Sequence, residues 1–286
     1  MTENCLELKD VSKSFPAFNL NKISFTLPKG YIMGLVGPNG AGKTTTIQLI
    51  LNMLEKDSGT ILVFGKDHIK EENAIKQDLG VVFDSIFYVD SWTIKETEKA
   101  ISAFYREWDH QVFSNMIDRF DLPREKKVRE LSRGMQMKLM LAAAFSHNAK
   151  LLLLDEPTSG LDPVTRSEFL DILQEYINDG ERSVLFSTHI TTDLERVADY
   201  ITLINKGELV YSGSMEDLLG GYWLIKGKPQ DLTTELEKEI MGLRKTEMGF
   251  EGLIKTQNAT GYKQYVLDKA TIDDIVVGIS KGGLKK

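Results

Sequence analysis

The sequence predicts an α/β fold in which a mostly parallel sheet carries an N-terminal antiparallel β subdomain, a helical insertion and a small C-terminal α+β unit. Three observations support this prediction. Unbroken apolar runs such as "YIMGLV" and "KLLLLD" are typical of strands buried on both faces. Segments of helical length and spacing separate these runs, and this alternation favours a parallel sheet. A chain of 286 residues is long enough for one large domain with a small appendage.

The N-terminal segment, residues 5–36, reads as strands separated by turns. "LELKDV" alternates apolar and polar residues, and in "ISFTL" the side chains of Ile23, Phe25 and Leu27 share one face. "PKG" turns the chain into the buried strand "YIMGLV". A glycine-rich loop and the helical segment "KTTTIQLILNML" follow, and "SGTILVFG" at 58–65 returns to strand.

Residues 91–145 change character and are predicted to be helical. Two sets of apolar residues each share one helical face, namely Ile94, Ile101, Phe104, Tyr105 and Trp108, and then Phe113, Met116, Ile117 and Phe120. The buried strand "KLLLLDEP" comes next, followed by a helix with Asp162 as N-cap and Pro163 as first helical residue. "SVLFSTH" is a third buried strand, and "YITLINKGELVYSG" predicts a hairpin that turns at residues 205–207.

These patterns define the expected domains. Residues 1–219 form the main domain, with a helical subdomain at about 85–145, and residues 220–286 form a small accessory unit. In this unit we expect strand-like segments such as "YWLIKG" and "YKQYVLD" and a helix near 231–243. The accessory unit carries the weakest pattern, and a stabilising appendage is its simplest interpretation.

Composition excludes several classes of protein. The formal net charge of −7, without a long Lys/Arg run, argues against a nucleic-acid surface. The single cysteine, Cys5, allows neither an internal disulfide nor a thiolate zinc cluster. The start "MTENCLELKD" resembles neither a signal peptide nor an acylation motif, and no apolar stretch is long enough to span a bilayer. We therefore expect an intracellular chain that reaches a membrane only through another protein.

The glycine-rich loop matches the P-loop pattern G-x-x-x-x-G-K-[ST] and lies between a strand and a helix, as the motif requires. Glycines let phosphate oxygens approach the backbone, whose N–H groups point inward beside a helix N-terminus. Lys43 supplies charge for the β- and γ-phosphates, and Thr44 offers a hydroxyl to Mg²⁺. The residues expected to bind nucleotide are Gly37, Pro38, Asn39, Gly40, Ala41, Gly42, Lys43, Thr44 and Thr45.

Asp155 and Glu156 end the buried strand "LLLLD". In a P-loop protein the Asp is expected to hold Mg²⁺ through water, and the following carboxylate can polarise the attacking water as general base. Strands often stop at acidic turn residues, so the pair would mean little alone. A P-loop more than a hundred residues upstream makes a catalytic role the better interpretation.

With these motifs in order, residues 5–220 resemble the ATP-binding cassette (ABC) ATPases. "LSRGMQMKL" resembles the family's signature, "SGLD" at 159–162 its loop after the catalytic Glu, and "STH" its switch histidine. The resemblance implies ATP and Mg²⁺ as cofactors. It also implies that His189 is catalytic with Glu156 and Lys43, that Phe15 stacks on adenine, and that Asp162 belongs to the nucleotide site.

In this family the signature caps the ATP held by a second subunit, so that two chains sandwich two nucleotides head to tail. The resemblance thus implies a homodimer, or a heterodimer with a second ABC ATPase chain. Ser132 as N-cap and Gly134 at a point of close backbone approach suit a helix N-terminus that faces a γ-phosphate. Binding would close the dimer and hydrolysis would open it.

Two departures from the family pattern stand out. Arg133 and Met135 replace the usual glycine and glutamine of the signature, either as neutral drift or because Arg133 places a cation near the partner's nucleotide. Asp84 occupies the position where the family usually has a glutamine that contacts Mg²⁺ and water. Our hypothesis is that Asp84 keeps a metal-binding and catalytic role with altered reach. The competing interpretation is a weakened coupling element in a slower enzyme.

Three functions remain open at this point. The favoured one is the nucleotide-binding subunit of a membrane transporter, peripheral on the cytoplasmic face of the cell membrane, with separate transmembrane permease chains and export as the favoured direction. The alternative is a soluble ABC ATPase that acts on nucleic acid or ribosomes, against which the absence of coiled coils, zinc-binding cysteines and a second cassette argues. A small-molecule kinase would leave the signature unexplained. The cargo is not encoded in any motif of the sequence.

Overall fold

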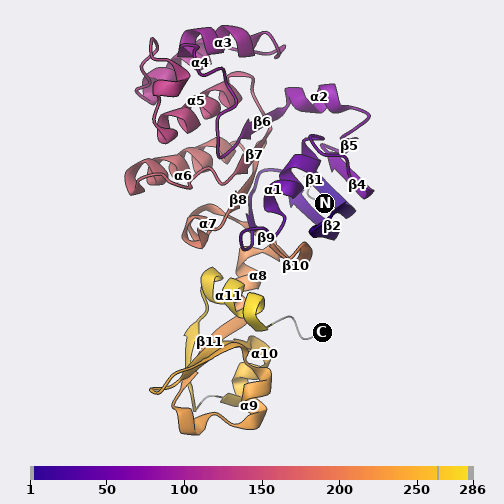
Figure 1. Cartoon of the computed structure of the whole chain (residues 1–286), viewed down its shortest axis with the longest axis vertical. Helices are drawn as coiled ribbons and strands as arrows, with labels where there is room; N and C mark the ends of the chain where they lie inside the picture. Colours follow the sequence, from indigo (N-terminus) through magenta and orange to yellow (C-terminus); the bar gives the residue numbers. More distant parts are fainter. Residues whose placement is uncertain (1–2, 263, 283–286) are drawn as a thin grey trace.

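The computed structural model describes residues 3–262 and 264–282. One ten-stranded sheet has the order β5-β4-β1-β2-β10-β9-β3-β8-β7-β6, and a separate four-stranded sheet has the order β12-β13-β11-β14 (Figure 1). The strands of the large sheet are β1 (Asn4–Phe15), β2 (Phe18–Pro28), β3 (Ile32–Val36), β4 (Ser58–Val63), β5 (Lys66–Asp67), β6 (Leu79–Val82), β7 (Leu151–Asp155), β8 (Ser183–Thr188), β9 (Tyr200–Asn205) and β10 (Glu208–Ser214). The α/β class predicted from the sequence is confirmed.

The parallel half of the large sheet consists of β9, β3, β8, β7 and β6. Every residue of β3, β7 and β8 is buried, as expected for strands covered by helices on both faces. The helices of this half are α1 (Lys43–Ile50), α2 (Glu72–Gln77), α6 (Pro163–Ile177), α7 (Thr191–Val197) and α8 (Met215–Gly220). Because parallel strands end at one edge, the loops after β3, β7 and β8 meet there.

The antiparallel half is built from β1, β2, β4 and β5. The alternation in the sequence is confirmed, since Leu6 and Leu8 of β1 and Ile23 of β2 are buried. A single parallel pairing of Glu208 in β10 with Asn21 in β2 joins this half to the parallel strands. The antiparallel β subdomain is therefore continuous with the main sheet.

The helical insertion contains α3 (Ile94–Ser102), α4 (His110–Arg119), the 3-10 turn η1 (Val128–Glu130) and α5 (Arg133–Ser146). The predicted continuation of the first helix through Phe104 is wrong. Helix α3 ends at Ser102, and Phe104 is 77% exposed. The cause is Gln77, whose side chain donates to the carbonyl of Phe104 and accepts from the N–H of Arg106. These bonds satisfy backbone groups that a further helical turn would otherwise pair.

The C-terminal unit contains β11 (Tyr222–Gly227), η2 (Pro229–Asp231), α9 (Thr234–Glu239), β12 (Met241–Lys245), β13 (Phe250–Lys255), α10 (Thr256–Ala259), η3 (Thr260–Tyr262), β14 (Val266–Lys269) and α11 (Ile272–Gly282). Its strands follow a β-α-β-β-α-β order with antiparallel pairing throughout. The helix predicted near 231–243 is shorter, because Met241 pairs with Leu253 and so begins a strand. The strand predicted in "YKQYVLD" begins only at Val266.

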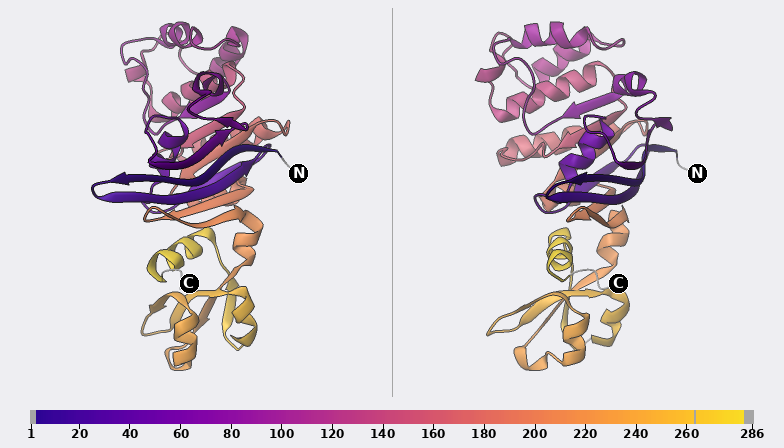
Figure 2. Two further views of the ribbon diagram at one scale, coloured as in Figure 1. Left: turned by 90° about the vertical axis from the view of Figure 1, so that its right-hand side faces the viewer. Right: turned by 45° about the vertical axis from the view of Figure 1, so that its right-hand side comes forward.

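The helical insertion and the C-terminal unit lie at opposite ends of the molecule, with the large sheet between them (Figures 1 and 2). Helix α11 lies between the small sheet and the main domain, and α9 and α10 cover the other face of that sheet. Ile272 and Ile275 of α11 are fully buried in the same apolar cluster as Leu194 of α7. Among the described residues, no helix combines the length and apolarity needed to cross a membrane.

Candidate nucleotide site

The glycine loop connects β3 to α1, and its geometry requires glycine. Gly40 and Gly42 adopt positive φ of 78° and 113°, a region that L side chains rarely enter. A Cβ on Gly37 would lie 2.1 Å from the carbonyl oxygen of Ile204, so no side chain fits there. The buried Lys43 donates from Nζ to the carbonyl oxygen of Gly37 at 2.8 Å. A hydrogen bond to the start of the loop thus fixes the position of the Lys43 side chain.

A cavity of about 600 Å³ opens beside this loop. It brings together residues that the sequence places far apart: the loop, the segment after β6, the segment after β7 and the residue after β8. The residues that line it are Ala17, Phe18, Asn39, Gly40, Ala41, Gly42, Lys43, Thr44, Thr45, Asp84, Glu156, Ser159 and His189. Most of the residues predicted for nucleotide binding and catalysis therefore share one cavity.

Glu156 occupies an unusual backbone position in this cavity. Its φ is +49°, an uncommon value for a non-glycine residue, and its N–H donates to the carbonyl of Ser187 at 3.0 Å. Oε2 of Glu156 accepts from Nδ1 of His189 at 2.6 Å, and Oε1 lies 3.3 Å from Nζ of Lys43. Backbone strain of this kind is frequent at functional sites. One carboxylate thus contacts both Lys43 and His189.

Asp155 lies beneath the cavity, 5% exposed, at the end of β7. Burial raises the pKa of Asp155, hydrogen bonds from Ser187 and Thr44 oppose the rise, and the nearby carboxylates of Glu156 and Asp84 add to it. Oγ of Ser187 donates to Oδ1 of Asp155 at 2.6 Å. The carboxylate of Asp155 thus lies near Thr44 and is repelled by those of Glu156 and Asp84, and such repulsion between carboxylates favours a bound cation.

The donor set at this point is suited to Mg²⁺. Thr44, Asp84 and Asp155 offer hard oxygens, which this ion prefers. The described residues contain no cluster of three or more His, Cys, Asp or Glu side chains with metal-binding geometry. Mg²⁺ in nucleotide sites needs no such cluster, because it is usually bound through one or two carboxylates together with substrate phosphates. The residues present therefore fit the ion.

The signature residues lie outside this cavity. Ser132 caps α5 by accepting from the N–H of Met135, as predicted. A Cβ on Gly134 would lie 3.1 Å from Thr165, so the start of α5 packs directly on the start of α6. Asp162 caps α6 and accepts from the N–H of Thr165, also as predicted. The structure does not bring Ser132, Gly134 or Asp162 to the phosphate loop of the same chain.

The aromatic residue beside the loop is Phe18 rather than Phe15. Phe18 lines the cavity and packs on Gly42, whereas Phe15 lies next to Phe18, with ring centroids 6.3 Å apart. Phe18 and Ala17 were not among the residues predicted for the site, whereas Ser159 opens the "SGLD" motif. The only signal for Phe18 was its position in "SFPAF", where both aromatics flank the β1–β2 turn.

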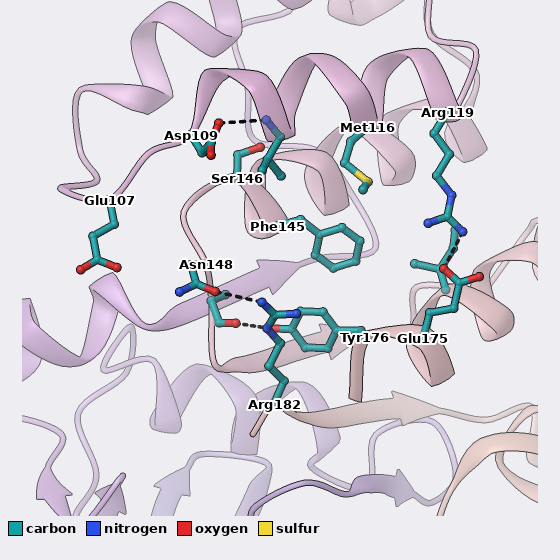
Figure 3. Close-up of a pocket in the computed structure, with 13 residues that line it drawn as sticks. Glu107, Asp109, Met116, Arg119, Phe145, Ser146, Asn148, Glu175, Tyr176 and Arg182 are labelled. Carbon is teal, nitrogen blue, oxygen red and sulfur yellow. Dashed lines mark hydrogen bonds and ion pairs between the residues drawn. The ribbon is translucent and has the colours of Figure 1, made fainter. Parts of the chain in front are cut away.

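A second cavity, of about 480 Å³, lies between the helical insertion and α6 (Figure 3). Its floor is the stacked pair Phe145 and Tyr176, with ring centroids 5.1 Å apart. At one side Arg119 of α4 bonds to Glu175 of α6 at 2.6 Å, which ties the insertion to the core. This cavity belongs to the joint between the two parts and contains none of the predicted nucleotide residues.

Comparison with known proteins identifies the family. A family model described as "ABC transporter" matches residues 20–159. The ABC transporter ATP-binding protein YtrB of Bacillus subtilis (strain 168) is 33% identical over 218 residues, which cover 76% of this chain and 74% of YtrB. The chain belongs to the ABC transporter ATP-binding proteins. The resemblance seen in the sequence is confirmed.

Other relatives of this ABC transporter ATP-binding protein support the same family assignment. The linearmycin resistance ATP-binding protein LnrL of Bacillus subtilis (strain 168) is 32% identical over 234 residues, covering 77% of this chain and 74% of LnrL. A solved ATP-binding subunit of an ABC transporter superposes with a TM-score of 0.68 and 26% identity, over 75% of this chain and 91% of that chain. The protein is thus an ABC ATPase, an ATP-binding and ATP-hydrolysing transporter subunit. A small-molecule kinase is excluded.

Proposed function

We propose that this ABC ATPase powers export through a membrane permease, and that ATP closes it head to tail on a second ATPase chain. In this proposal residues 1–219 form the ATP-binding domain and residues 220–286 an accessory unit. One observation carries it: Lys43, Glu156 and His189 share one cavity, while Ser132 lies on a separate surface. A complete site then needs the signature of another chain.

The cavity residues have distinct roles in hydrolysis. Lys43 binds the β- and γ-phosphates, which compete with Glu156 for its ammonium group. Glu156 accepts a proton from the attacking water as general base. His189 donates to Glu156 through Nδ1 and so orients the carboxylate. Phe15 provides the adenine platform and lies next to Phe18, which contacts Gly42 of the phosphate loop. In this arrangement ATP is bound both at its adenine ring and at its phosphates.

Mg²⁺ would be held by the Thr44 hydroxyl and by Asp155 and Asp84. When bound, the ion neutralises charge on the phosphates and orients them for attack. The raised pKa of Asp155 supports this assignment, because a cation at the site would relieve the mutual repulsion of the carboxylates.

The direction of transport is proposed from a relative. LnrL is a linearmycin resistance protein, and transport that confers resistance removes the compound, which is export. The chain would be peripheral on the cytoplasmic face of the membrane, held there by its permease. The relative YtrB is an ABC transporter ATP-binding protein, which favours this role over a soluble one on nucleic acid or ribosomes.

The permease is proposed to dock on an aromatic groove that follows β6. A cavity of about 200 Å³ is lined there by Phe83, Phe87, Tyr88, Tyr105 and His147, among others. Phe87 is 70% exposed at this groove. Large exposed apolar side chains rimming a cavity are typical of protein–protein contact sites. Asp84 directly follows Phe83 in the chain, so a shift at the groove can reach the metal ligands.

The pairing is tested with Glu156→Gln, which keeps the shape of the site and removes the base. With saturating ATP and Mg²⁺, this variant should have the molar mass of a dimer in light scattering. The dimer forms either between two copies of this chain or with a related ATPase chain from the same cells. The double variant Ser132→Ala/Glu156→Gln should show a smaller fraction of dimer than Glu156→Gln alone. A Glu156→Gln chain that stays monomeric with every such chain would refute the head-to-tail scheme. Purification of the native complex from membranes identifies the permease, and copurification with ribosomes alone would favour the soluble role.

A further inference from the structure

Helix α7 connects the switch histidine to the rest of the domain. It begins at Thr191, two positions after His189. Its Asp193, 2% exposed, accepts from the hydroxyl of Thr158 at 2.7 Å and from Nε of Arg166 at 2.5 Å. Thr158 lies in the segment that follows Glu156. The first turn of α7 is therefore bonded to the segment that follows the proposed general base.

The first turn of α7 lacks its own cap. The N-cap residue is Ile190, whose side chain cannot accept a hydrogen bond from the helix N–H groups. The neighbouring helices α5 and α6, by contrast, are capped by the side chains of Ser132 and Asp162. The first turn of α7 is therefore held by Asp193 and by contacts with other elements rather than by an N-cap side chain.

The C-terminal unit supplies a further anchor for α7. Oγ1 of Thr191 donates to Oδ1 of Asp273 in α11 at 3.0 Å, and Oε1 of Glu195 in α7 accepts from the N–H of Ile272 at 3.0 Å. Ile272 and Leu194 are both fully buried in one apolar cluster. Two hydrogen bonds and a shared core thus attach α11 to α7 beside the nucleotide site.

We propose that the C-terminal unit sets the hydrolytic competence of the nucleotide site, with Asp273 as a positioning residue that acts through Thr191 on His189. The inference rests on the proposed function, because it assumes that His189 orients Glu156. The side chain of His189 is 47% exposed, and its Nδ1 hydrogen-bonds to Glu156. The orientation of the His189 side chain therefore depends on the short backbone segment that joins β8 to α7. This segment ends at Thr191, the first residue of α7.

The anchor acts on catalysis and not on ATP affinity. The phosphate loop and Lys43 belong to β3 and α1, whereas the anchored segment carries only His189. Loss of the Thr191–Asp273 bond should therefore lower kcat and leave KM for ATP nearly unchanged. If the loss of a hydrogen bond of ordinary strength acts wholly on the transition state, kcat falls by roughly three- to tenfold.

The test uses the full chain with Asp273→Ala, Thr191→Val and the double variant. Each single change should lower kcat roughly three- to tenfold, and the double variant should lose no more than one of them, because both remove one bond. Asp273→Asn keeps an acceptor oxygen for the Thr191 hydroxyl and should retain most of the turnover. Asp268→Ala is the matched control, since it breaks an exposed ion pair with Lys226 in the same unit, away from α7.

The outcomes separate this inference from the proposed function. Unchanged kcat in Asp273→Ala, fully additive losses in the double variant, or an equal loss in Asp268→Ala each overturn the positioning role. A loss of turnover that only follows a lowered unfolding temperature, without rescue by Asp273→Asn, also overturns it. If instead Glu156→Gln and His189→Ala keep full turnover, the proposed catalytic roles fail, whatever Asp273→Ala does.

Discussion

Nδ1 of His189 lies 2.6 Å from Oε2 of Glu156, although the two residues belong to loops that follow different strands. The contact exists because β7 and β8 are neighbours in the sheet, so their carboxyl ends open side by side. The positive φ of Glu156 turns its carboxylate toward both His189 and Lys43. The arrangement places one carboxylate between Lys43 of the phosphate loop and His189.

Replacement of the proposed general base should stop turnover. Glu156→Gln removes proton acceptance and should lower kcat by roughly 10²–10⁴-fold, measured as phosphate release with saturating MgATP. Glu181→Gln changes a surface glutamate that pairs with Lys29 and is the matched control. Turnover that survives in Glu156→Gln would assign the base to another group.

Magnesium binding should weaken in acid. The pKa of Asp155 is raised, first by burial, so its carboxyl group takes up a proton at a higher pH than a free aspartate does. A protonated ligand does not bind the cation, and Mg²⁺-dependent thermal stabilisation by ATP should fall as the pH drops through that raised pKa. In Asp155→Asn both the stabilisation and its pH dependence should be small. A pH-independent Mg²⁺ requirement in the unmodified chain would contradict this assignment.

Asp84 should contribute to the metal site. Asp84→Ala should raise the Mg²⁺ concentration needed for half-maximal turnover by roughly tenfold, the usual scale for loss of a supporting ligand interaction. Asp84→Gln restores a side-chain oxygen and should recover part of the affinity. Titration of turnover with Mg²⁺ at fixed ATP measures both. An unchanged midpoint in Asp84→Ala would leave Asp84 with no role at the metal.

His147 should make folding stability depend on pH. Burial lowers its pKa from 6.5 to about 4, and the hydrogen bond from Nδ1 to the carbonyl of Gln77 only partly opposes this. Between these values the unfolded chain binds a proton that the folded chain excludes, so stability is full above about pH 6.5 and falls toward pH 4. The loss is on the order of 3 kcal/mol.

His147→Phe tests this directly. The ring of His147 stacks on Tyr105 with centroids 3.8 Å apart, and a phenyl ring can keep that stack without a proton site. Urea unfolding at several pH values should show a smaller loss of stability in the variant than in the unmodified chain. Identical losses would mean that His147 does not exclude the proton.

The aromatic groove should be needed for permease binding. Phe87→Ser removes an exposed ring from the groove and should reduce copurification with the permease, while the unfolding temperature changes little. Met248→Ser changes another highly exposed apolar residue, in the C-terminal unit, and serves as control. Equal copurification of both variants would place the permease elsewhere.

Local physics made part of the structure predictable. The strand, glycine loop and helix around Lys43 follow from dihedral freedom and from the anion-binding end of a helix. The caps at Ser132 and Asp162 follow from side-chain acceptors that meet the first free N–H groups of a helix. The end of the buried strand at Asp155 and Glu156 was likewise predictable, because the sequence changes there from apolar to acidic residues.

Other features depend on partners remote in the chain. Gln77 ends the helix before Phe104, and β13 converts the end of a predicted helix into β12. Phe18 reaches the cavity because the β1–β2 turn lies over Gly42, which no local pattern announces. In each case a hydrogen bond or packing contact outweighs the weak intrinsic preference of the segment.

The sequence alone therefore determined the class of fold, the phosphate loop, the acidic strand end and the capped helix starts, because each depends on residues within a few positions of one another. Only the tertiary structure decided that Glu156 meets His189 and that Asp273 holds Thr191, which is 82 positions away. Such pairs arise from strand order and helix packing. Strand order and helix packing depend on the burial of the apolar surface of the whole chain, so no single segment of the sequence predicts them.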